Sequence, residues 1–371
     1  MNTPPIIYRI ALAGLGNVGA SVLAILHREE QSLRKRYGVQ FLVTGVAELG
    51  GGALDPNGLD LGLLLDTLQA KRPVADLPTI GRPGMMAIDL LEHAKPDMLL
   101  EATPVNLEHG QPGLGLVQAA LQRGIHSILA NKGPAALAFR ELASMSDWGA
   151  GWGADFNPHF IPVTGIKPAP KLRFNACVAG ALPTTTIGSR DLAGCRVQRM
   201  EAVFNGTTQY ILRAMEDGHS YAEALADAQR RGIAETDPSL DVDGWDAAAK
   251  LVIAANAVLG QPTQLSDVEV HGIRTLSNET VQQALADGQR IVLVCLAELS
   301  DDRYQLSVKP TPLPLDHPLC RITPDEMAVV YYTQDVERLS IASSEPGPEP
   351  AAAAMIRDML DIIRSDFERN A

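Results

Sequence analysis

Apolar residues in the first 150 positions alternate between short strand-like runs and longer helical patterns. The apolar run at 6–13 (IIYRIALA) is followed by a helical pattern at 20–38 and a second strand-like run at 41–48. Two further strand-like runs, at 97–103 and 126–130, each follow a helical pattern. Strands that alternate with helices predict a parallel sheet covered on both faces, a doubly wound α/β domain of the Rossmann type.

Two loops of this domain are candidates for ligand binding. One begins at Thr103-Pro104, ahead of a long helix expected to run through Arg123, and the other is Asn131-Lys132. Both follow predicted parallel strands, and open α/β sheets bind ligands at the carboxyl ends of such strands. Lys132 is either a surface lysine or a cation directed at a cofactor or substrate.

Residues 50–84, rich in Gly, Asp and Pro, predict a long excursion with one short helix.

The pattern changes after about Trp152. Further strand-like runs occur at 172–188, 198–205, 291–299, 304–310, 328–333 and 338–343, and helical patterns separate several of them. These runs predict an α+β domain with an open mixed sheet, and an amphipathic helix at 351–367 ends the chain. We therefore expect a dinucleotide-binding domain at 1–152, a second domain at 153–345, and a C-terminal helix within 346–371.

A glycine-rich turn joins the first strand to the first helix. It reads Gly14, Leu15, Gly16, Asn17, Val18, Gly19, a GxGxxG pattern in the strand–turn–helix setting typical of dinucleotide binding. Gly14 permits the tight turn, Gly16 lets the backbone approach a pyrophosphate, and Gly19 allows close helix–strand packing. The helix N-terminus would supply N–H groups to the phosphates.

The second strand ends at Glu48, where an acidic residue accepts hydrogen bonds from an adenosine ribose. This position favours NAD. Arg72 or Arg82 would have to reach back from the following loops to bind the 2′-phosphate of NADP, so both cofactors remain open.

A stretch rich in ionisable side chains lies at 234–260, AETDPSLDVDGWDAAAKLVIAANAVLG. Five carboxylates fall within twelve residues and Lys250 follows them: Glu235, Asp237, Asp241, Asp243 and Asp246. We expect a helix with Asp243 and Asp246 near a capping box and Gly260 at its end. Asp246 and Lys250 then share one face. The carboxylates need a cation, either Lys250, a metal or a cationic substrate group; the alternative is an ordinary capped surface helix. A calcium loop is excluded because Lys250 occupies the position of its bidentate glutamate.

Composition narrows the class of protein. A net charge of −13 argues against nucleic acid and anionic membrane surfaces as partners. No 18-residue apolar run occurs, and the N-terminus lacks the features of a signal peptide, so a cytoplasmic protein is expected. The four cysteines lie far apart without a CxxC pair, which suggests neither a disulfide framework nor a zinc site.

Together these segments resemble homoserine dehydrogenase, in the short form without an appended regulatory ACT domain. The markers are GLGNVG (14–19), DPNGLDL (55–61), EATPVN (101–106), ANKGP (130–134), CVAGALP (177–183), FNGTTQYIL (204–212), AETDPSLDVDGWDAAAKL (234–251) and DHPL (316–319). The resemblance implies NAD(P)-dependent interconversion of L-aspartate 4-semialdehyde and L-homoserine, a step towards threonine and methionine. It also implies that the second domain is catalytic and forms a homodimer or a dimer-based tetramer. The C-terminal helix within 346–371 is expected to pack back on the first domain, as in the family.

The resemblance also assigns roles to matching residues. Lys250 matches the general acid/base, with Asp246 beside it, and Lys132 matches a lysine near the nicotinamide and substrate. Glu235, Asp241 and Thr207 match substrate-binding positions. Backbone oxygens of the segment matching Asn175, Val178, Gly180 and Leu182 would hold a monovalent cation, Na⁺ or K⁺.

Two departures from the family pattern concern the substrate and the cation. Asn175 stands where the family usually has Glu, and Ile233 where Tyr is usual. The second change motivates an alternative, a related dehydrogenase for another amino-acid aldehyde or hydroxy acid. A third hypothesis is a non-catalytic dinucleotide-binding protein. The presence of Lys250 and Glu235 at the positions that match the family argues against it.

Overall fold

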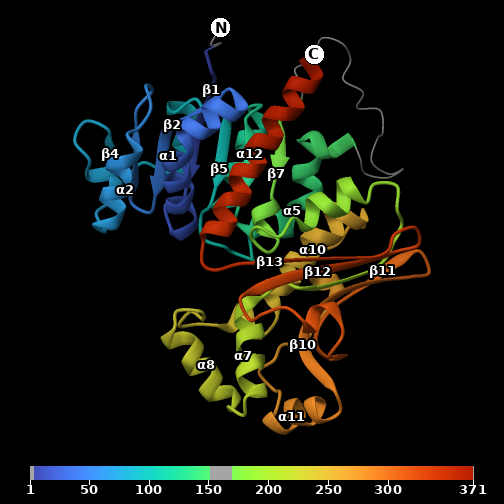
Figure 1. Ribbon diagram of the computed structural model, residues 1–371. Coiled ribbons are helices and arrows are strands. Elements are labelled where there is room, and N and C mark those ends of the chain that lie inside the picture. Colours follow the sequence, from blue (N-terminus) through green and yellow to red (C-terminus); the bar gives the residue numbers. More distant parts are fainter. Residues whose placement is uncertain (1–3, 151–168, 371) are drawn as a thin grey trace. The chain divides into compact units, whose positions relative to one another are not determined.

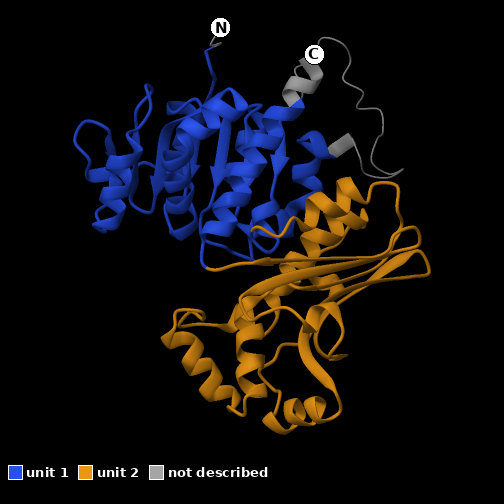
Figure 2. Cartoon of the chain, in the orientation of Figure 1, with its two compact units in different colours: residues 1–180, 347–371 blue, residues 181–346 orange. Residues whose placement is uncertain are grey.

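The computed structural model describes residues 4–150 and 169–370 (Figure 1). The chain forms two compact units, residues 1–180 together with 347–371, and residues 181–346 (Figure 2). The boundary expected at residue 152 lies outside the described residues. The chain beyond this gap remains with the first unit as far as Gly180.

The first unit is built on a seven-stranded sheet, sheet A. Its strands, in spatial order, are β4 (Gly81–Pro83), β3 (Gly51–Leu54), β2 (Val39–Glu48), β1 (Ile6–Ala13), β5 (Met98–Glu101), β6 (His126–Leu129) and β7 (Leu172–Arg173). The five strands from β2 to β7 are parallel, and β3 and β4 add antiparallel strands at one edge. The helices of this unit are α1 (Asn17–Tyr37), α2 (Leu61–Gln69), α3 (Leu90–His93), α4 (Gly113–Gln122), α5 (Lys132–Ser144) and α12 (Glu349–Asn370).

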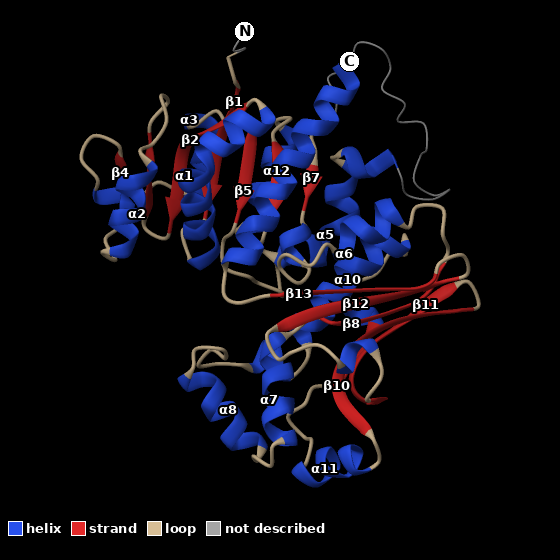
Figure 3. Ribbon diagram, in the orientation of Figure 1, coloured by secondary structure: helices blue, strands red, loops and turns tan. Residues whose placement is uncertain are grey.

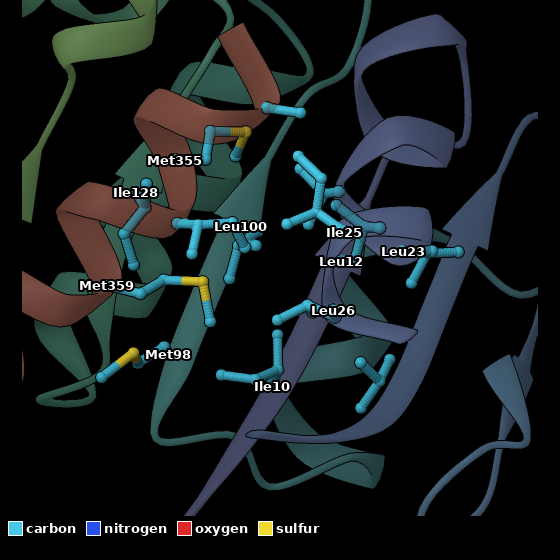
Figure 4. Packing of buried hydrophobic residues seen from close by; sticks show 14 of the residues in the cluster. Ile10, Leu12, Leu23, Ile25, Leu26, Met98, Leu100, Ile128, Met355 and Met359 are labelled. Carbon is cyan, nitrogen blue, oxygen red and sulfur yellow. The ribbon is translucent and has the colours of Figure 1, made fainter. Parts of the chain in front are cut away.

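Side chains of β1 alternate between two cores because successive residues of a strand face opposite sides of the sheet. Ile10 and Leu12 pack with α1 and α12 (Figure 4), whereas Ala11 and Ala13 pack with α3 and α4. Helices therefore cover both faces of sheet A, and the predicted doubly wound class is confirmed. Helix α12 lies along α1, and its Ile362 carbonyl accepts a hydrogen bond from Lys171 Nζ at 2.8 Å.

The second unit is built on a six-stranded mixed sheet, sheet B (Figure 3). Its order is β13 (Glu337–Ser344), β12 (Glu326–Thr333), β8 (Val197–Val203), β10 (Gln289–Ser300), β11 (Arg303–Pro314) and β9 (Val268–Val270). Neighbours are antiparallel except for β11 and β9, which run parallel. The helices are α6 (Thr184–Thr186), α7 (Gly206–Glu216), α8 (Tyr221–Arg230), α9 (Ser239–Val242), α10 (Trp245–Leu259) and α11 (Asn278–Ala286).

Helix α10 is the central helix of this unit. Every residue from Asp246 to Ala257 is buried, and the helix contacts β9, β10 and β11. A helix that is apolar on all sides must lie inside a core. Any charged side chain that it carries is therefore withdrawn from water.

Several sequence-based expectations were wrong in detail. Residues 172–188 are strand only at β7, because Ala179 and Gly180 have φ of 62° and 58°, which an extended strand cannot accommodate. The helix expected after Pro104 begins at Gly113. Within the described part of the chain, no helix has the length and hydropathy required to cross a membrane.

Candidate active site

The glycine turn between β1 and α1 is closely packed at Gly14 and Gly19 and open at Gly16. Gly14 has a φ of 95°, and a Cβ there would lie 2.2 Å from the carbonyl oxygen of Ala102. A Cβ on Gly19 would lie 2.0 Å from the carbonyl oxygen of Gly14. A Cβ on Gly16 would meet nothing within 4 Å. Packing therefore requires glycine at 14 and 19, whereas Gly16 leaves open space at the N-terminus of α1, where phosphates bind. Asn17 and Val18 form the first turn of that helix.

Glu48 is the last residue of β2, and its side chain is held by the chain itself. Its Oε1 accepts a hydrogen bond from the backbone N–H of Val74 at 2.8 Å. The guanidinium of Arg82 donates to the carbonyls of Thr79 and Gly81 at 2.8 and 2.7 Å, so this side chain is engaged in its own loop. A carboxylate fixed at the end of β2 fits a ribose hydroxyl better than a 2′-phosphate.

The loops after β5 and β6 are joined by Glu101, which sequence reasoning missed. Its Oε1 accepts from the backbone N–H of Thr103 at 2.9 Å, from the Thr103 hydroxyl, and from Asn131 Nδ2 at 3.4 Å. Burial raises the pKa of Glu101 to about 7. Asn131 also caps α5 and donates to the Pro104 carbonyl at 3.5 Å, and Lys132 is the first residue of that helix. Thr103, Pro104 and Lys132 thus follow the carboxyl ends of β5 and β6 in sheet A.

Lys250 and Asp246 form a buried ion pair on α10. Nζ of Lys250 lies 2.8 Å from Oδ2 of Asp246 and donates to the carbonyl oxygen of Phe204 at 2.5 Å. Both residues are only 8% exposed. The predicted i,i+4 pair is therefore present, and its burial distinguishes it from an ordinary surface pair.

Asn205, a second residue that sequence reasoning missed, connects this pair to Asp241. Its Nδ2 donates to Asp241 Oδ1 at 2.6 Å and to Asp246 Oδ2 at 2.9 Å. Burial and the neighbouring charge of Asp246 raise the pKa of Asp241, while the hydrogen bond from Asn205 and the charge of Lys250 act in the opposite direction. The structure thus brings together Lys250, Asp246, Asp241 and Thr207, and the Thr207 hydroxyl also donates to the Ile233 carbonyl at 3.2 Å.

The five carboxylates of 235–246 do not form one cluster. Asp243 pairs with Arg274 at 2.8 Å, and Asp237 accepts from the Ser239 hydroxyl at 2.6 Å. Glu235 is exposed. The expected capping box is also wrong, since Gly244, with a φ of 89°, precedes α10 without a side-chain cap. At its other end the helix stops at Gly260, as predicted, with a φ of 63°.

In the segment proposed to hold a cation, the side chain of Asn175 is already engaged by a residue of the first unit. Asn175 donates from its backbone N–H to Asp358 Oδ2 at 3.0 Å and from Nδ2 to Oδ1 at 2.5 Å. Val178 and Gly180 follow Asn175 in that unit, whereas Leu182 belongs to the second. No group of three or more His, Cys, Asp or Glu side chains suited to a metal ion occurs among residues 4–150 and 169–370.

Comparisons with known proteins identify the family of this chain. A family model described as homoserine dehydrogenase matches residues 183–360. Homoserine dehydrogenase from Methanocaldococcus jannaschii is 30% identical over 96% of this chain and 98% of its own length. An NAD(+)-dependent homoserine dehydrogenase from Pseudomonas canavaninivorans is 29% identical over 96% and 97%. The crystal structure of homoserine dehydrogenase from Thermoplasma acidophilum aligns with a TM-score of 0.77 at 26% identity, covering 96% of this chain and 99% of that chain. The chain therefore belongs to the homoserine dehydrogenase family.

Proposed function

We propose that the protein catalyses the NAD(P)-dependent interconversion of L-aspartate 4-semialdehyde and L-homoserine. The observation that supports this most strongly is the buried Lys250–Asp246 pair beside Asp241, in a chain of this family. A buried lysine that hydrogen bonds to one carboxylate and one carbonyl is suited to holding and releasing a single proton.

The cofactor, when bound, supplies hydride transfer at its nicotinamide ring. Residues of the first unit would hold it, the turn 14–19 at its pyrophosphate and Glu48 at its ribose; the open space at Gly16 and the position of Glu48 at the end of β2 support this assignment. Thr103, Pro104 and Lys132 are proposed to hold the nicotinamide half. The engaged Arg82 and the fixed Glu48 support NAD as the preferred cofactor, with NADP as the alternative.

Lys250 is proposed to move the proton at the substrate oxygen. In the direction of reduction, its ammonium gives a proton to the oxygen that becomes the hydroxyl group of homoserine. In the direction of oxidation, the neutral amine takes that proton back, so oxidation is favoured at alkaline pH. Asp246 stabilises the charged form of the lysine and orients it.

The substrate carries an ammonium group, which the acidic side of this site can bind. We assign Asp241 and Glu235 to the ammonium and Thr207 to a polar contact with the substrate. Asp241 is partly buried and interacts electrostatically with Lys250, whereas Glu235 is exposed, so the role of Glu235 depends on the bound state.

Ile233 supports a second candidate function. Its side chain is 40% exposed next to the carbonyl that Thr207 contacts, at a position where the family usually has Tyr. A dehydrogenase for a related amino-acid aldehyde or hydroxy acid would follow if this change altered substrate choice. Values of kcat/KM for L-homoserine and close analogues separate the two, and an analogue favoured by more than about tenfold supports the second function.

We also propose that the protein is a cytoplasmic homodimer or dimer-based tetramer that acts in threonine and methionine biosynthesis. A monovalent cation, Na⁺ or K⁺, is proposed at the backbone oxygens of Asn175, Val178, Gly180 and Leu182. The cation proposal predicts that turnover depends on added K⁺ or Na⁺, and analytical ultracentrifugation of the full chain tests the assembly.

The direct test of the function is absorbance at 340 nm with L-homoserine at alkaline pH. NAD⁺ and NADP⁺ are compared, each with and without added K⁺ or Na⁺. Turnover with one of the cofactors supports the function and identifies the preferred cofactor. Cofactor binding without turnover under any of these conditions contradicts it.

A further inference from the structure

Asn205 lies between β8 and α7 and is 4% exposed. Its side-chain oxygen accepts hydrogen bonds from the backbone N–H of Thr208 at 2.9 Å and from the Thr208 hydroxyl at 3.0 Å. The residue therefore caps α7, and capping fixes the direction of its amide nitrogen.

The amide nitrogen has two hydrogens, and carboxylates accept both. One goes to Asp241 at 2.6 Å and the other to Asp246 at 2.9 Å. The Asp246 oxygen that accepts it, Oδ2, is the same atom that lies 2.8 Å from Lys250 Nζ. Asn205 and Lys250 thus share one oxygen.

Among the described residues, ionisable side chains from several elements of the second unit interact electrostatically with the ammonium of Lys250. They are Asp246 on α10, Asp241 on α9, Cys295 on β10 and Glu345 after β13. Burial raises the pKa of the Cys295 thiol to about 12, so this group is uncharged. Burial also raises the pKa of Glu345, which accepts hydrogen bonds from the backbone N–H groups of Ala181 and Leu182. Asp241 and Asp246 are the two carboxylates that Asn205 contacts directly.

We infer that Asn205 is a positioning residue that weakens the hold of Asp246 and Asp241 on the Lys250 ammonium, so that the lysine releases its proton more readily. The donated hydrogens spread part of the carboxylate charge over the amide, and less of it acts on Nζ. This inference rests on the proposed function, in which homoserine oxidation requires neutral Lys250.

Two substitutions separate this role from helix capping. Ser and Asp are both good N-cap residues, so Asn205→Ser and Asn205→Asp each retain the cap on α7. The serine removes the amide donors, and the aspartate in addition places a third carboxylate beside the first two. Ser277 caps α11, which packs on α7 and β10, so Ser277→Asp is a matched control that retains a cap and adds one charge.

The expected readout is a shift of the pH profile of homoserine oxidation. Without the amide donors, more of the charge of Asp246 and Asp241 acts on Nζ of Lys250. The midpoint of kcat/KM should therefore move upward by about half a pH unit in Asn205→Ser and by about one unit in Asn205→Asp. A shift of one unit makes kcat/KM about tenfold lower at pH 8, with recovery near pH 10. A merely structural role lowers kcat/KM by the same factor at every pH, and Ser277→Asp should leave the midpoint unchanged.

A second readout does not depend on turnover. In protein labelled with ¹³C at lysine Cε, NMR follows the Lys250 signal through a pH titration, and that signal is the one missing in Lys250→Met. Upward-shifted midpoints in both Asn205 variants support the inference, and unchanged midpoints overturn it. If wild-type protein shows no turnover while the NMR midpoints shift, the proposed function fails and the positioning role stands.

Discussion

Lys250 and Asp246 lie one helical turn apart on α10, with Nζ 2.8 Å from Oδ2 and both side chains almost fully buried. The pairing of a buried ammonium with a single carboxylate oxygen makes its proton sensitive to every change at that oxygen. Breaking such a pair leaves an uncompensated buried charge, which is costly.

Replacing Asp246 with Asn should therefore shift the pH profile in the direction opposite to the Asn205 variants. The amide accepts a hydrogen bond from Lys250 but provides no negative charge, so the ammonium loses its proton at lower pH. We expect the midpoint of kcat/KM for homoserine oxidation to fall by about one pH unit. An unchanged midpoint, measured over pH 6 to 10, would mean that Asp246 does not act on Lys250.

The glycine turn allows binding and packing to be tested separately. Gly16→Ala should retain the fold, with at most about 1 kcal/mol lost from a weaker cap on α1, but it places a methyl group in the space assigned to the pyrophosphate. We expect NADH to bind about tenfold more weakly, measured by the change in its fluorescence on binding.

Gly19→Ala is the comparison. Its methyl group would lie 2.0 Å from the Gly14 carbonyl oxygen, and overpacking of this kind costs about 1–3 kcal/mol. Thermal denaturation should therefore show a larger loss of stability for Gly19→Ala than for Gly16→Ala. The reverse order would contradict the assignment of packing to Gly19 and binding to Gly16.

Glu101 should make the stability of the protein depend on pH. Its pKa is about 7 in the folded state and 4.5 in the reference state, so the folded protein binds the proton more tightly. Stability from this group is full below about pH 4.5 and is lost as the pH rises to about 7, by on the order of 3 kcal/mol. Gln does not titrate, so Glu101→Gln should gain stability relative to wild type between pH 5 and pH 8. A constant difference in melting temperature across that range would contradict the prediction.

Asn175, which stands where the family usually has Glu, is paired with a buried carboxylic acid. Asp358, fully buried on α12, accepts both hydrogen bonds from Asn175, and burial raises its pKa to about 6. Restoring the family residue with Asn175→Glu places two carboxylates in contact. We expect a loss of about 3 kcal/mol at pH 8, measured by urea denaturation, and a smaller loss at pH 5, where Asp358 is protonated. Asn175→Glu combined with Asp358→Asn should recover most of the stability; equal losses in the single and double variants would refute this pairing.

Local sequence patterns were sufficient to predict individual strands and helices such as β1 and α10. The run at 6–13 is β1, and the apolar periodicity after Gly244 is α10, because alternation and helical spacing both report burial directly. The segment 172–188 was misread, since its apolar residues suggest a strand while the left-handed Ala179 and Gly180 break it. No single-residue propensity indicates a positive φ at an alanine.

Only the part of the candidate site that lies within one helix was predicted from the sequence. Asp246 and Lys250 are four positions apart in the sequence (i,i+4), so their contact follows from the helix alone. Asn205 contacts Asp241 and Asp246 across 36 and 41 positions, and Glu101 contacts Asn131 across 30 positions. Such contacts depend on the tertiary structure. The five neighbouring carboxylates were expected to act together, but the turn at Gly244 directs Asp243 to Arg274 instead.

The most direct measurement compares wild-type protein and Lys250→Met in homoserine oxidation at 340 nm, with cofactor affinity measured in parallel. We predict that wild type turns over, that kcat/KM for the variant falls by at least about a hundredfold at every pH, and that NADH affinity is unchanged. Methionine fills a similar volume without a proton to exchange, so retained binding with lost turnover assigns the proton transfer to Lys250. Undiminished turnover in Lys250→Met would contradict that role.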